Sequence, residues 1–289
     1  MTPLYIGGQP VGPGCPVFVI AEIGINHNGS LELARELIDA AVAAGCDAVK
    51  FQKRTVEQVY TADELAAHRE SPFGHTNGAL KHGLEFDADA YAAIETHCRA
   101  RGIRWFASCW DPASIDFIDA FDPPCYKIAS AGLADDTLLR SHTGRGRPIL
   151  LSTGMSAPDE IDHAVGLLRG EALALLHCTS AYPASLDDLN LRVMAWLRER
   201  YDVPVGYSGH EVGLAASVAA VALGACIIER HLTLDRAMWG SDQAASVEPH
   251  GLARLVKDIR AVERALGDGV KRVHASELPA RDKLRRVRS

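Results

Sequence analysis

The sequence has little of what marks membrane, secreted or nucleic-acid-binding proteins. Its seven cysteines form no Cys-x-x-Cys pair, which excludes a zinc ribbon and suits a reducing compartment. The longest apolar stretch, 214–228, is too short to span a membrane and contains Gly224. The N-terminus lacks the charged and apolar regions of a signal peptide, and a net charge of −7 argues against nucleic acid as the main partner. We therefore expect a cytoplasmic enzyme that binds neither nucleic acid nor membranes.

Linkers and glycine-rich phosphate loops are also missing. No Pro/Ser-rich or low-complexity segment divides the 289 residues, and GINHNG at 24–29 is neither a Walker A loop nor a dinucleotide fingerprint. One domain is therefore predicted, with an N-terminal hairpin or cap at 1–16, the main body at 17–280 and a basic tail at 281–289.

Short apolar runs alternate with amphipathic stretches along the whole chain. Continuous rather than alternating apolar runs are typical of parallel strands that are buried on both faces. Eight such runs are present, at Val17–Ile23, Ala48–Gln52, Arg104–Ser108, Cys125–Ile128, Pro148–Ser152, Leu173–His177, Val205–Ser208 and Ile227–His231. Right-handed crossovers would wind eight βα units into a closed barrel, so the predicted fold is a single-domain α/β structure, a (β/α)8 TIM barrel.

Six helices are predicted between these strands. They cover Leu31–Ala44, Asp87–Arg101, Ala157–Leu168, Leu189–Arg200, Gly213–Leu223 and Pro249–Leu266. The connection at 53–86 is unusually long for a barrel, and long βα loops at the carboxyl ends of strands often form lids or substrate walls.

Polar residues end the predicted strands, and in a barrel these ends converge on one cavity. Lys50 and Lys127, with Ser152 and Ser208, form a set suited to a phosphate monoester, since ammonium groups balance its charge and hydroxyls donate to its oxygens. The alternative is that each lysine pairs with a barrel carboxylate such as Glu22.

Two histidines, His210 and His231, each end a short apolar run on neighbouring predicted strands. Imidazole is a common ligand of catalytic divalent metals, and adjacent strand ends lie close enough to share one ion. Taken singly, each could instead be a structural histidine. His27, His163 and His250 lack such a setting and are expected to be solvated or supporting groups.

Seven segments give the sequence a specific resemblance to the sialic acid synthase family. They are IAEIGINHNGSL at 20–31, VKFQ at 49–52, YKIAS at 126–130, PILLSTGM at 148–155, LLHCTSAYP at 175–183, GYSGHE at 206–211 and ERHLTLDR at 229–236. Members of this family condense phosphoenolpyruvate with an aldose to make a 3-deoxy-2-keto sugar acid. Their fold is an α/β barrel, in agreement with the strand count.

The resemblance implies a role for each matched position. Phosphoenolpyruvate would be bound by Lys50, Lys127, Ser152, Ser208 and Ser180. A divalent ion, commonly Mn²⁺ with Mg²⁺ or Co²⁺ as alternatives, would sit on His210 and His231. The sugar would meet Gln52, Tyr182 and Asp242, and the catalytic set would be Glu22, Lys50, Lys127 and Asp242.

Departures from the family pattern raise specific questions. Cys109 and Trp110 follow Ser108 where relatives have Thr-Pro, and Gly132 stands where they carry a carboxylate, for which Asp111 or Asp135 could substitute. Relatives continue into an antifreeze-like domain beyond the position of Ser289. We therefore expect the barrel domain only, in a homodimer or with a separate partner domain that covers the site.

The leading hypothesis is a metal-dependent synthase that condenses phosphoenolpyruvate with N-acetylmannosamine or a related aldose and releases phosphate. A second hypothesis keeps the barrel but makes it a sugar-phosphate aldolase or isomerase, in which a lysine could form a Schiff base. A third is a non-catalytic sugar- or phosphate-binding relative.

Overall fold

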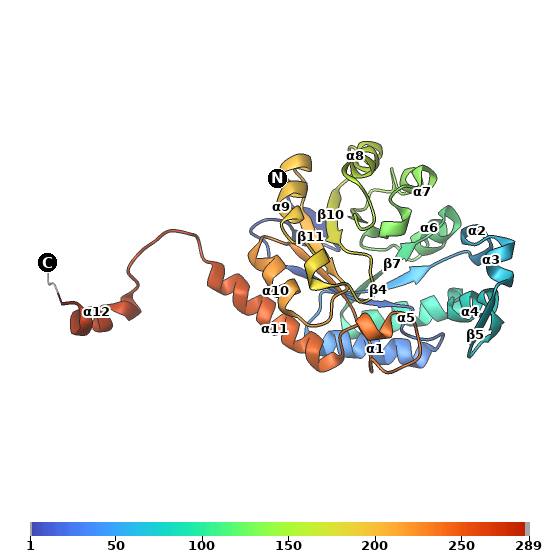
Figure 1. Cartoon of the computed structure of the whole chain (residues 1–289), viewed down its shortest axis with the longest axis horizontal. Coiled ribbons are helices and arrows are strands. Elements are labelled where there is room, and N and C mark those ends of the chain that lie inside the picture. Colours follow the sequence, from blue (N-terminus) through green and yellow to red (C-terminus); the bar gives the residue numbers. More distant parts are fainter. Residues whose placement is uncertain (1, 287–289) are drawn as a thin grey trace.

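Eight parallel strands close into a barrel in this computed structural model, which describes residues 2–286 (Figure 1). Around the barrel the order is β10-β11-β12-β3-β4-β7-β8-β9. The strands are β3 (Phe18–Gly24), β4 (Ala48–Lys53), β7 (Arg104–Cys109), β8 (Tyr126–Ile128), β9 (Ile149–Ser152), β10 (Leu173–Cys178), β11 (Val205–Gly209) and β12 (Ile227–His231). All eight fall on the predicted runs, and the predicted (β/α)8 barrel is confirmed.

Helices follow the strands and cover the outside of the barrel (Figure 1). They are α1 (Leu31–Ala44), α5 (Ala88–Arg101), α6 (Pro112–Asp119), α7 (Asp136–Ser141), α8 (Pro158–Leu167), α9 (Val193–Tyr201), α10 (Ala215–Ala222) and α11 (Pro249–Leu266). The bounds of α1 and α11 are those predicted. In α1 the Ser30 side chain accepts a hydrogen bond from the Leu33 N–H, and Gly45 ends the helix in the left-handed conformation.

Two crossover helices, α6 and α7, were not predicted because they have only eight and six residues. Too few turns are present in such helices for a 3.6-residue pattern to stand out. Short 3₁₀ turns also occur, at Ser130–Gly132, Leu186–Asp188, Gln243–Ala245 and Ala275–Glu277. In the part of the chain that is described, no helix combines the length and apolarity needed to cross a membrane.

The barrel interior is sealed at the amino ends of the strands by apolar side chains. Phe18, Ile20, Phe106, Leu150 and other inward-facing residues form one buried cluster there. A hairpin of β1 (Leu4–Ile6) and β2 (Gln9–Val11) adds its own buried residues to this cluster, Leu4, Ile6 and Val11. The domain limits at residues 16 and 280 stay predictions.

The long connection after β4 is a folded insertion. It contains α2 (Val56–Val59), α3 (Ala62–Ala66), an antiparallel hairpin of β5 (His68–Ser71) and β6 (Gly74–Thr76), and α4 (Asn77–Leu84). It packs closely on the turn after β3: a Cβ on Gly29 would lie 2.3 Å from the Gly83 carbonyl oxygen and 3.1 Å from the Phe73 ring. The insertion therefore forms a wall beside the carboxyl ends of β3 and β4.

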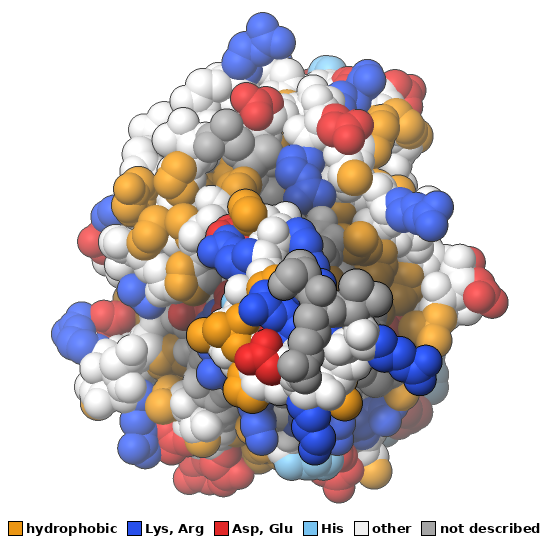
Figure 2. All heavy atoms as spheres, turned by 90° about the vertical axis from the view of Figure 1, so that its left-hand side faces the viewer, with side chains coloured by type: hydrophobic (Ala, Val, Ile, Leu, Met, Phe, Trp, Pro, Cys, Tyr) orange, Lys and Arg blue, Asp and Glu red, His pale blue; other side chains and the backbone are white. Residues whose placement is uncertain are grey.

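The chain leaves the barrel after α11 as an extended arm that ends in α12 (Leu278–Leu284) (Figure 1). Seen end-on, the arm points toward the viewer and carries Lys and Arg side chains beside hydrophobic ones (Figure 2). Residues 287–289 of the predicted basic tail lie outside the described residues.

Candidate active site

A cavity of about 210 Å³ opens at the carboxyl ends of the barrel strands. It brings together ten of the eleven residues predicted for the site: Glu22, Lys50, Gln52, Lys127, Ser152, Ser180, Tyr182, Ser208, His210 and His231. The eleventh, Asp242, lies beside the cavity, with its Oδ2 3.8 Å from Nδ1 of His231. The predicted convergence of the strand ends is therefore what the structure shows.

Strand alternation places these side chains. Successive residues of a strand face opposite sides, so every second residue of a barrel strand points inward. On β7 the inward Phe106 belongs to the apolar cluster, and Ser108, two residues later, lines the cavity. The same holds on β12, where Ile227 belongs to the apolar cluster and the next two inward residues, Glu229 and His231, line the cavity.

Lys50 is held by two partners. Its Nζ lies 2.8 Å from Oε2 of Glu22 and donates a 2.7 Å hydrogen bond to Oγ of Ser108. Gln52 donates a 3.0 Å hydrogen bond to the other Glu22 oxygen, and Gly24 is needed beside it because a Cβ there would lie 2.9 Å from that oxygen. The pairing of a lysine with Glu22, left open by the sequence, is thus present, and it lies in the wall of the cavity.

Lys127 has a different carboxylate neighbour, which the sequence analysis missed. Its Nζ donates a 2.7 Å hydrogen bond to Oγ of Ser152 and lies 3.7 Å from Oε1 of Glu229. Ser208 also donates to that oxygen, at 3.1 Å, and the second Glu229 oxygen is buried without a hydrogen-bond partner. The sequence signal was available, because Glu229 stands two residues before His231 and so shares its face of β12.

The two buried carboxylates have opposite pKa shifts. Burial raises the pKa of Glu22 to about 7, against the opposing effect of Lys50. Burial would also raise the pKa of Glu229, but the charges of Lys127 and Lys50 outweigh it and lower that pKa to about 2. At neutral pH Glu229 is ionised, whereas Glu22 can gain or lose a proton.

The two lysines also differ. Burial lowers the pKa of Lys127, with Glu229 acting in the opposite direction. Burial acts on Lys50 in the same sense, but Glu22 and Glu229 outweigh it and raise the pKa of Lys50. The charge of Lys127 is therefore the less well compensated of the two, and an anion in the cavity would stabilise it.

His210 and His231 face each other across the cavity, with ring centroids 5.3 Å apart. Nδ1 of His210 donates a 2.8 Å hydrogen bond to the Thr179 carbonyl, which leaves its Nε2 as the nitrogen with a free lone pair. Burial lowers the pKa of His210 to about 4 and that of His231 as well, so both rings are neutral at pH 7. Nδ1 of His231 is buried without a hydrogen-bond partner. Neutral imidazoles with free nitrogens have the chemistry of metal ligands.

A buried network outside the barrel holds both histidines in place. Arg230, which precedes His231, lies 2.9 Å from Oε1 of Glu211, which follows His210, and both side chains are almost completely buried. Tyr207 donates a 2.7 Å hydrogen bond to the other Glu211 oxygen. This network ties the end of β11 to β12 and thereby fixes the spacing of the two imidazoles.

The residues proposed to replace the carboxylate missing at Gly132 do not do so. Asp111 caps α6, accepting a 2.8 Å hydrogen bond from the Ser114 N–H, and Asp135 caps α7 through the Leu138 N–H at 3.0 Å. Neither lines the cavity, so that prediction was wrong. The carboxylates that do line it are Glu22 and Glu229.

The structure also shows where the departures at Cys109 and Trp110 and the three histidines outside the predicted metal pair lie. Cys109 faces away from the cavity and packs in the outer core, where its Sγ donates to the Ser114 carbonyl. The wall is completed by Trp110, whose Nε1 is buried without a hydrogen-bond partner and whose ring lies 4.4 Å from the Arg54 guanidinium carbon. His27 is buried against the Phe86 ring, while His163 and His250 are exposed.

Comparison with known proteins places the chain among sialic acid synthases. The NeuB family model matches residues 37–271. N-acetylneuraminate-9-phosphate synthase of Mus musculus is 39% identical over 282 residues, which are 96% of this chain and 79% of the relative. N,N'-diacetyllegionaminic acid synthase of Legionella pneumophila is 36% identical over 97% of this chain and 82% of its own. The crystal structure of N-acetylneuraminic acid synthetase from Leptospira borgpetersenii, in complex with citrate, superposes with a TM-score of 0.86 at 32% identity, covering 99% of this chain and 98% of that one. The chain therefore belongs to the NeuB family and is a sialic-acid-type synthase.

Proposed function

We propose that the chain condenses phosphoenolpyruvate with an aldose, N-acetylmannosamine or a related sugar, to form a 3-deoxy-2-keto acid of the sialic acid type and free phosphate. The observation that carries this proposal is the pair of buried lysines at the strand ends, each within 2.7 Å of a serine hydroxyl. The two neutral histidines lie in the wall of the same cavity.

The lysine side of the cavity would hold phosphoenolpyruvate. Lys50 and Lys127 would balance the phosphate charge, and Ser152 and Ser208 would donate hydrogen bonds to its oxygens. Ser180 supports this assignment because its buried Oγ has no hydrogen-bond partner among residues 2–286. Glu229 would balance the charge of the two ammonium groups while the anion is absent, since it lies 3.7 Å from Nζ of Lys127 and its pKa is lowered by the charges of both lysines.

The histidine side would hold a divalent ion, Mn²⁺ with Mg²⁺ or Co²⁺ as alternatives. His210 and His231 fit this role because both are neutral and each has a ring nitrogen free. In residues 2–286 no cluster of three or more His, Cys, Asp or Glu is placed to hold a metal, so the protein would supply two ligands and leave the others to substrate and water. When bound, such an ion would polarise the aldehyde carbonyl of the open-chain sugar as a Lewis acid.

The acceptor sugar would lie at the mouth of the cavity. Gln52 and Tyr182 line this region, and the Tyr182 ring lies against the His210 ring, tilted by 33° with centroids 4.2 Å apart, while remaining half exposed. Asp242 stands at the edge beside His231 and would accept a hydrogen bond from a sugar hydroxyl. These groups would hold the aldehyde carbon against C3 of phosphoenolpyruvate.

The reaction then follows from the placement of charge. C3 of phosphoenolpyruvate bonds to the aldehyde carbon, whose oxygen takes up a proton, and C2 becomes positively charged. Water adds to C2, and Glu22, with its pKa of about 7, would accept the proton that this water loses. The tetrahedral intermediate then breaks the C2–O bond to the phosphate. The phosphate leaves with the electron pair and takes up the proton that the C2 hydroxyl loses as it becomes the ketone, while Lys50 and Lys127 stabilise the charge of the phosphate.

The lowered pKa of Lys127 is also a property of lysines that form Schiff bases, which is the chemistry of the aldolase alternative. Borohydride treatment in the presence of sugar substrates separates the two. The synthase reaction has no imine, so we expect no covalent adduct on Lys127 and no loss of activity, whereas a sugar adduct on that lysine by mass spectrometry would support the aldolase.

The test of the proposed function is phosphate release from phosphoenolpyruvate with Mn²⁺ across a panel of aldoses with and without N-acyl groups. We expect release that depends on the aldose and is lost in chelator-treated protein. No release with any aldose, from a folded and metal-loaded protein, would reject the proposal and favour the binding-protein alternative. His210→Ala and His231→Ala should each reduce Mn²⁺ binding in calorimetry; unchanged binding in both would show that the metal lies elsewhere.

A further inference from the structure

Arg54, the first residue after β4, carries a buried charge that no step of the proposed reaction uses. Its side chain is 9% exposed, and the residue does not line the active-site cavity. A buried cation is unfavourable unless its charge and its N–H groups are paired, so its partners show what holds it in place. Three residues contact different parts of the guanidinium group: Gln52, Trp110 and Glu85.

The first contact sets the direction of the Gln52 side-chain amide. Nη2 of Arg54 donates a hydrogen bond to Oε1 of Gln52. The amide nitrogen of the same side chain donates a 3.0 Å hydrogen bond to Oε1 of Glu22. Because a guanidinium can only donate, its bond to the amide oxygen keeps the amide nitrogen turned toward the carboxylate. Gln52 lines the active-site cavity, and Arg54 supports it from behind.

The second contact is between the face of the guanidinium and an aromatic ring. The guanidinium carbon of Arg54 lies 4.4 Å from the centroid of the Trp110 ring, a distance at which a cation and a ring attract each other. Trp110 directly follows β7, and its N–H donates a 3.1 Å hydrogen bond to the Lys53 carbonyl. Trp110 also lines the active-site cavity. Arg54 therefore supports two residues of the cavity wall at once.

The third contact joins Arg54 to the end of the insertion after β4. Nη1 of Arg54 donates a 3.4 Å hydrogen bond to Oε1 of Glu85, and the Arg54 backbone N–H donates to Oε2 at 3.1 Å. Nζ of Lys53 lies 3.2 Å from Oε2 as well. Glu85 directly follows α4, so the end of the insertion is attached to the barrel where Arg54 holds Gln52.

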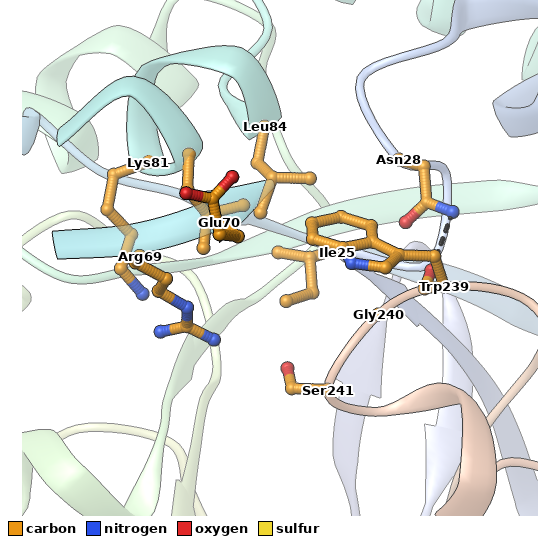
Figure 3. A pocket seen from close by; sticks show the side chains of 10 residues that line it. Ile25, Asn28, Arg69, Glu70, Lys81, Leu84, Trp239, Gly240 and Ser241 are labelled. Atoms are coloured by element: carbon orange, nitrogen blue, oxygen red, sulfur yellow. Dashed lines mark hydrogen bonds between the residues drawn. The ribbon is translucent and has the colours of Figure 1, made fainter. Parts of the chain in front are cut away.

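The hairpin of the insertion borders a different space. A second cavity, of about 270 Å³, lies between this hairpin and the loop after β12 (Figure 3). No residue among 2–286 lines both this cavity and the active-site cavity. Asn28 donates a 2.9 Å hydrogen bond to the Trp239 carbonyl there, and the Phe73 ring meets the Trp239 ring edge-on at 6.3 Å (Figure 3). The insertion is thus held at its hairpin by Trp239 and at its end by Arg54.

We propose that Arg54 is a positioning residue of the active site, which holds the Gln52 amide so that its nitrogen donates to Glu22. This inference rests on the proposed function, because Glu22 is the group expected there to accept a proton from water. An arginine suits the position, since one planar group donates to Gln52 and Glu85 while its face lies on Trp110. A lysine could pair with Glu85, but an ammonium group has neither the plane nor the fork for all three contacts.

The position of the Gln52 amide can be measured without turnover. In ¹⁵N-labelled protein its side-chain NH₂ gives a pair of NMR signals, which are assigned by their loss in Gln52→Ala. We expect Arg54→Met to shift this pair and to speed its hydrogen exchange, because the amide oxygen loses its donor. Glu85 keeps Lys53 as a partner in this variant, and Arg54→Lys, which retains the charge, takes its place if Arg54→Met does not fold. Unchanged Gln52 signals would overturn the proposal.

Arg145→Met is the matched control. Arg145 is also held by two side chains and a carbonyl, those of Asp116, Asp119 and Ser141, and none of these residues lines the active-site cavity. Its removal should leave the Gln52 signals and the kinetics at their wild-type values. The same shift of the Gln52 signals in Arg145→Met would show a general response to a lost arginine and would overturn the proposal.

Kinetics test whether this position of the amide matters for the reaction. Arg54→Met should lower kcat for phosphate release by about tenfold or more, since a hydrogen bond to a charged group is no longer held in place. KM for phosphoenolpyruvate should change little, because Lys127 and Ser152 are not touched. In a Gln52→Ala background, Arg54→Met should have almost no further effect on kcat, since Arg54 acts through Gln52.

An equal loss of kcat with and without Gln52 would assign Arg54 only to holding the insertion in place and would overturn the proposal, as would an unchanged kcat in Arg54→Met. The two measurements also separate this inference from the proposed function. If the wild-type protein released no phosphate with any aldose, the synthase chemistry would be rejected, and the NMR comparison would still decide whether Arg54 holds the Gln52 amide.

Discussion

The same eight strands carry two different inner surfaces, one at each end of the barrel. At the amino ends the inward residues are apolar and fully buried, as at Phe106, Leu150 and Ile227. Two residues later on the same strands stand Ser108, Ser152 and Glu229. The inner surface therefore changes from buried apolar side chains to polar and charged ones within two residues along each strand.

This contrast shows where the barrel can tolerate buried charge. Burying ionised groups is unfavourable unless they are paired, and here Lys50, Lys127 and Glu229 are paired only at the end that opens to substrate. The half of the barrel at the amino ends of the strands, here called the lower half, contains the apolar cluster sealed by the β1–β2 hairpin. The half at the carboxyl ends, the upper half, contains the cavity. Stability is assigned to the lower half and substrate binding to the upper, as is common in barrels of this kind.

Lys127→Met should give the largest effect on the upper half. Removing one ammonium group that stabilises the leaving phosphate should lower kcat/KM for phosphoenolpyruvate by about 10²–10³-fold. The lower half is untouched, so circular dichroism should show a folded barrel. Calorimetry should show a far greater loss of affinity for phosphoenolpyruvate than for the sugar; equal losses of both would contradict a phosphate role.

Leu150→Ala is the counterpart in the lower half, since Leu150 pairs in register with Lys127 on the neighbouring strand. The side chain is fully buried, and its truncation should reduce the free energy of unfolding by about 2–5 kcal/mol. Denaturant titration measures this change. Below the unfolding transition, kcat/KM should fall much less than in Lys127→Met, and a similar loss of activity would break the division of the barrel into two halves.

The pH dependence of kcat/KM tests Glu22. As a proton acceptor it must be ionised, and burial raises its pKa to about 7, so activity should increase as the pH rises through about 7. In Glu22→Gln the remaining activity should be low and should lose this rising limb. A variant that keeps the wild-type profile would assign the limb to another group.

His27 gives a smaller effect, on stability alone. Burial lowers its pKa to about 3, below its ordinary 6.5, so the unfolded chain binds a proton that the folded protein excludes. Stability from this residue is complete above pH 6.5 and is lost as the pH falls from 6.5 toward 3. Between pH 6.5 and 3, His27→Phe should reduce the slope of the free energy of unfolding against pH by up to about 1.4 kcal/mol per pH unit. An unchanged slope would show that His27 does not contribute.

Much of the barrel and of its polar end was predictable because both follow from short-range patterns. Continuous apolar runs marked the strands, and a polar residue at the end of each run marked the cavity. Glu229 was missed, although it stands two residues before His231 and therefore faces the same side of the strand. In the sequence alone, a glutamate within a strand looks like a residue that pairs with a charged side chain on the surface. Asp111 and Asp135 were misjudged because a helix cap and a site carboxylate look alike in sequence.

The insertion after β4 was predicted only as a long wall, and its inner structure was not. Its helices have four, five and eight residues, and its hairpin strands have four and three. These elements are too short to show the 3.6-residue period of a helix or the two-residue period of a strand. The second cavity depends on contacts between Asn28, Phe73 and Trp239, which lie far apart in the chain. Local patterns carry no information about such contacts.

The fate of the bridging oxygen tests the central claim most directly, that the lysine end of the barrel expels phosphate from a condensed intermediate. Phosphoenolpyruvate labelled with ¹⁸O between C2 and phosphorus would be turned over with an accepted aldose, and both products analysed by mass spectrometry. Cleavage of the C2–O bond predicts that the label leaves in inorganic phosphate and that none is released without the aldose. Label retained in the organic product, or phosphate released without an aldose, would contradict the account.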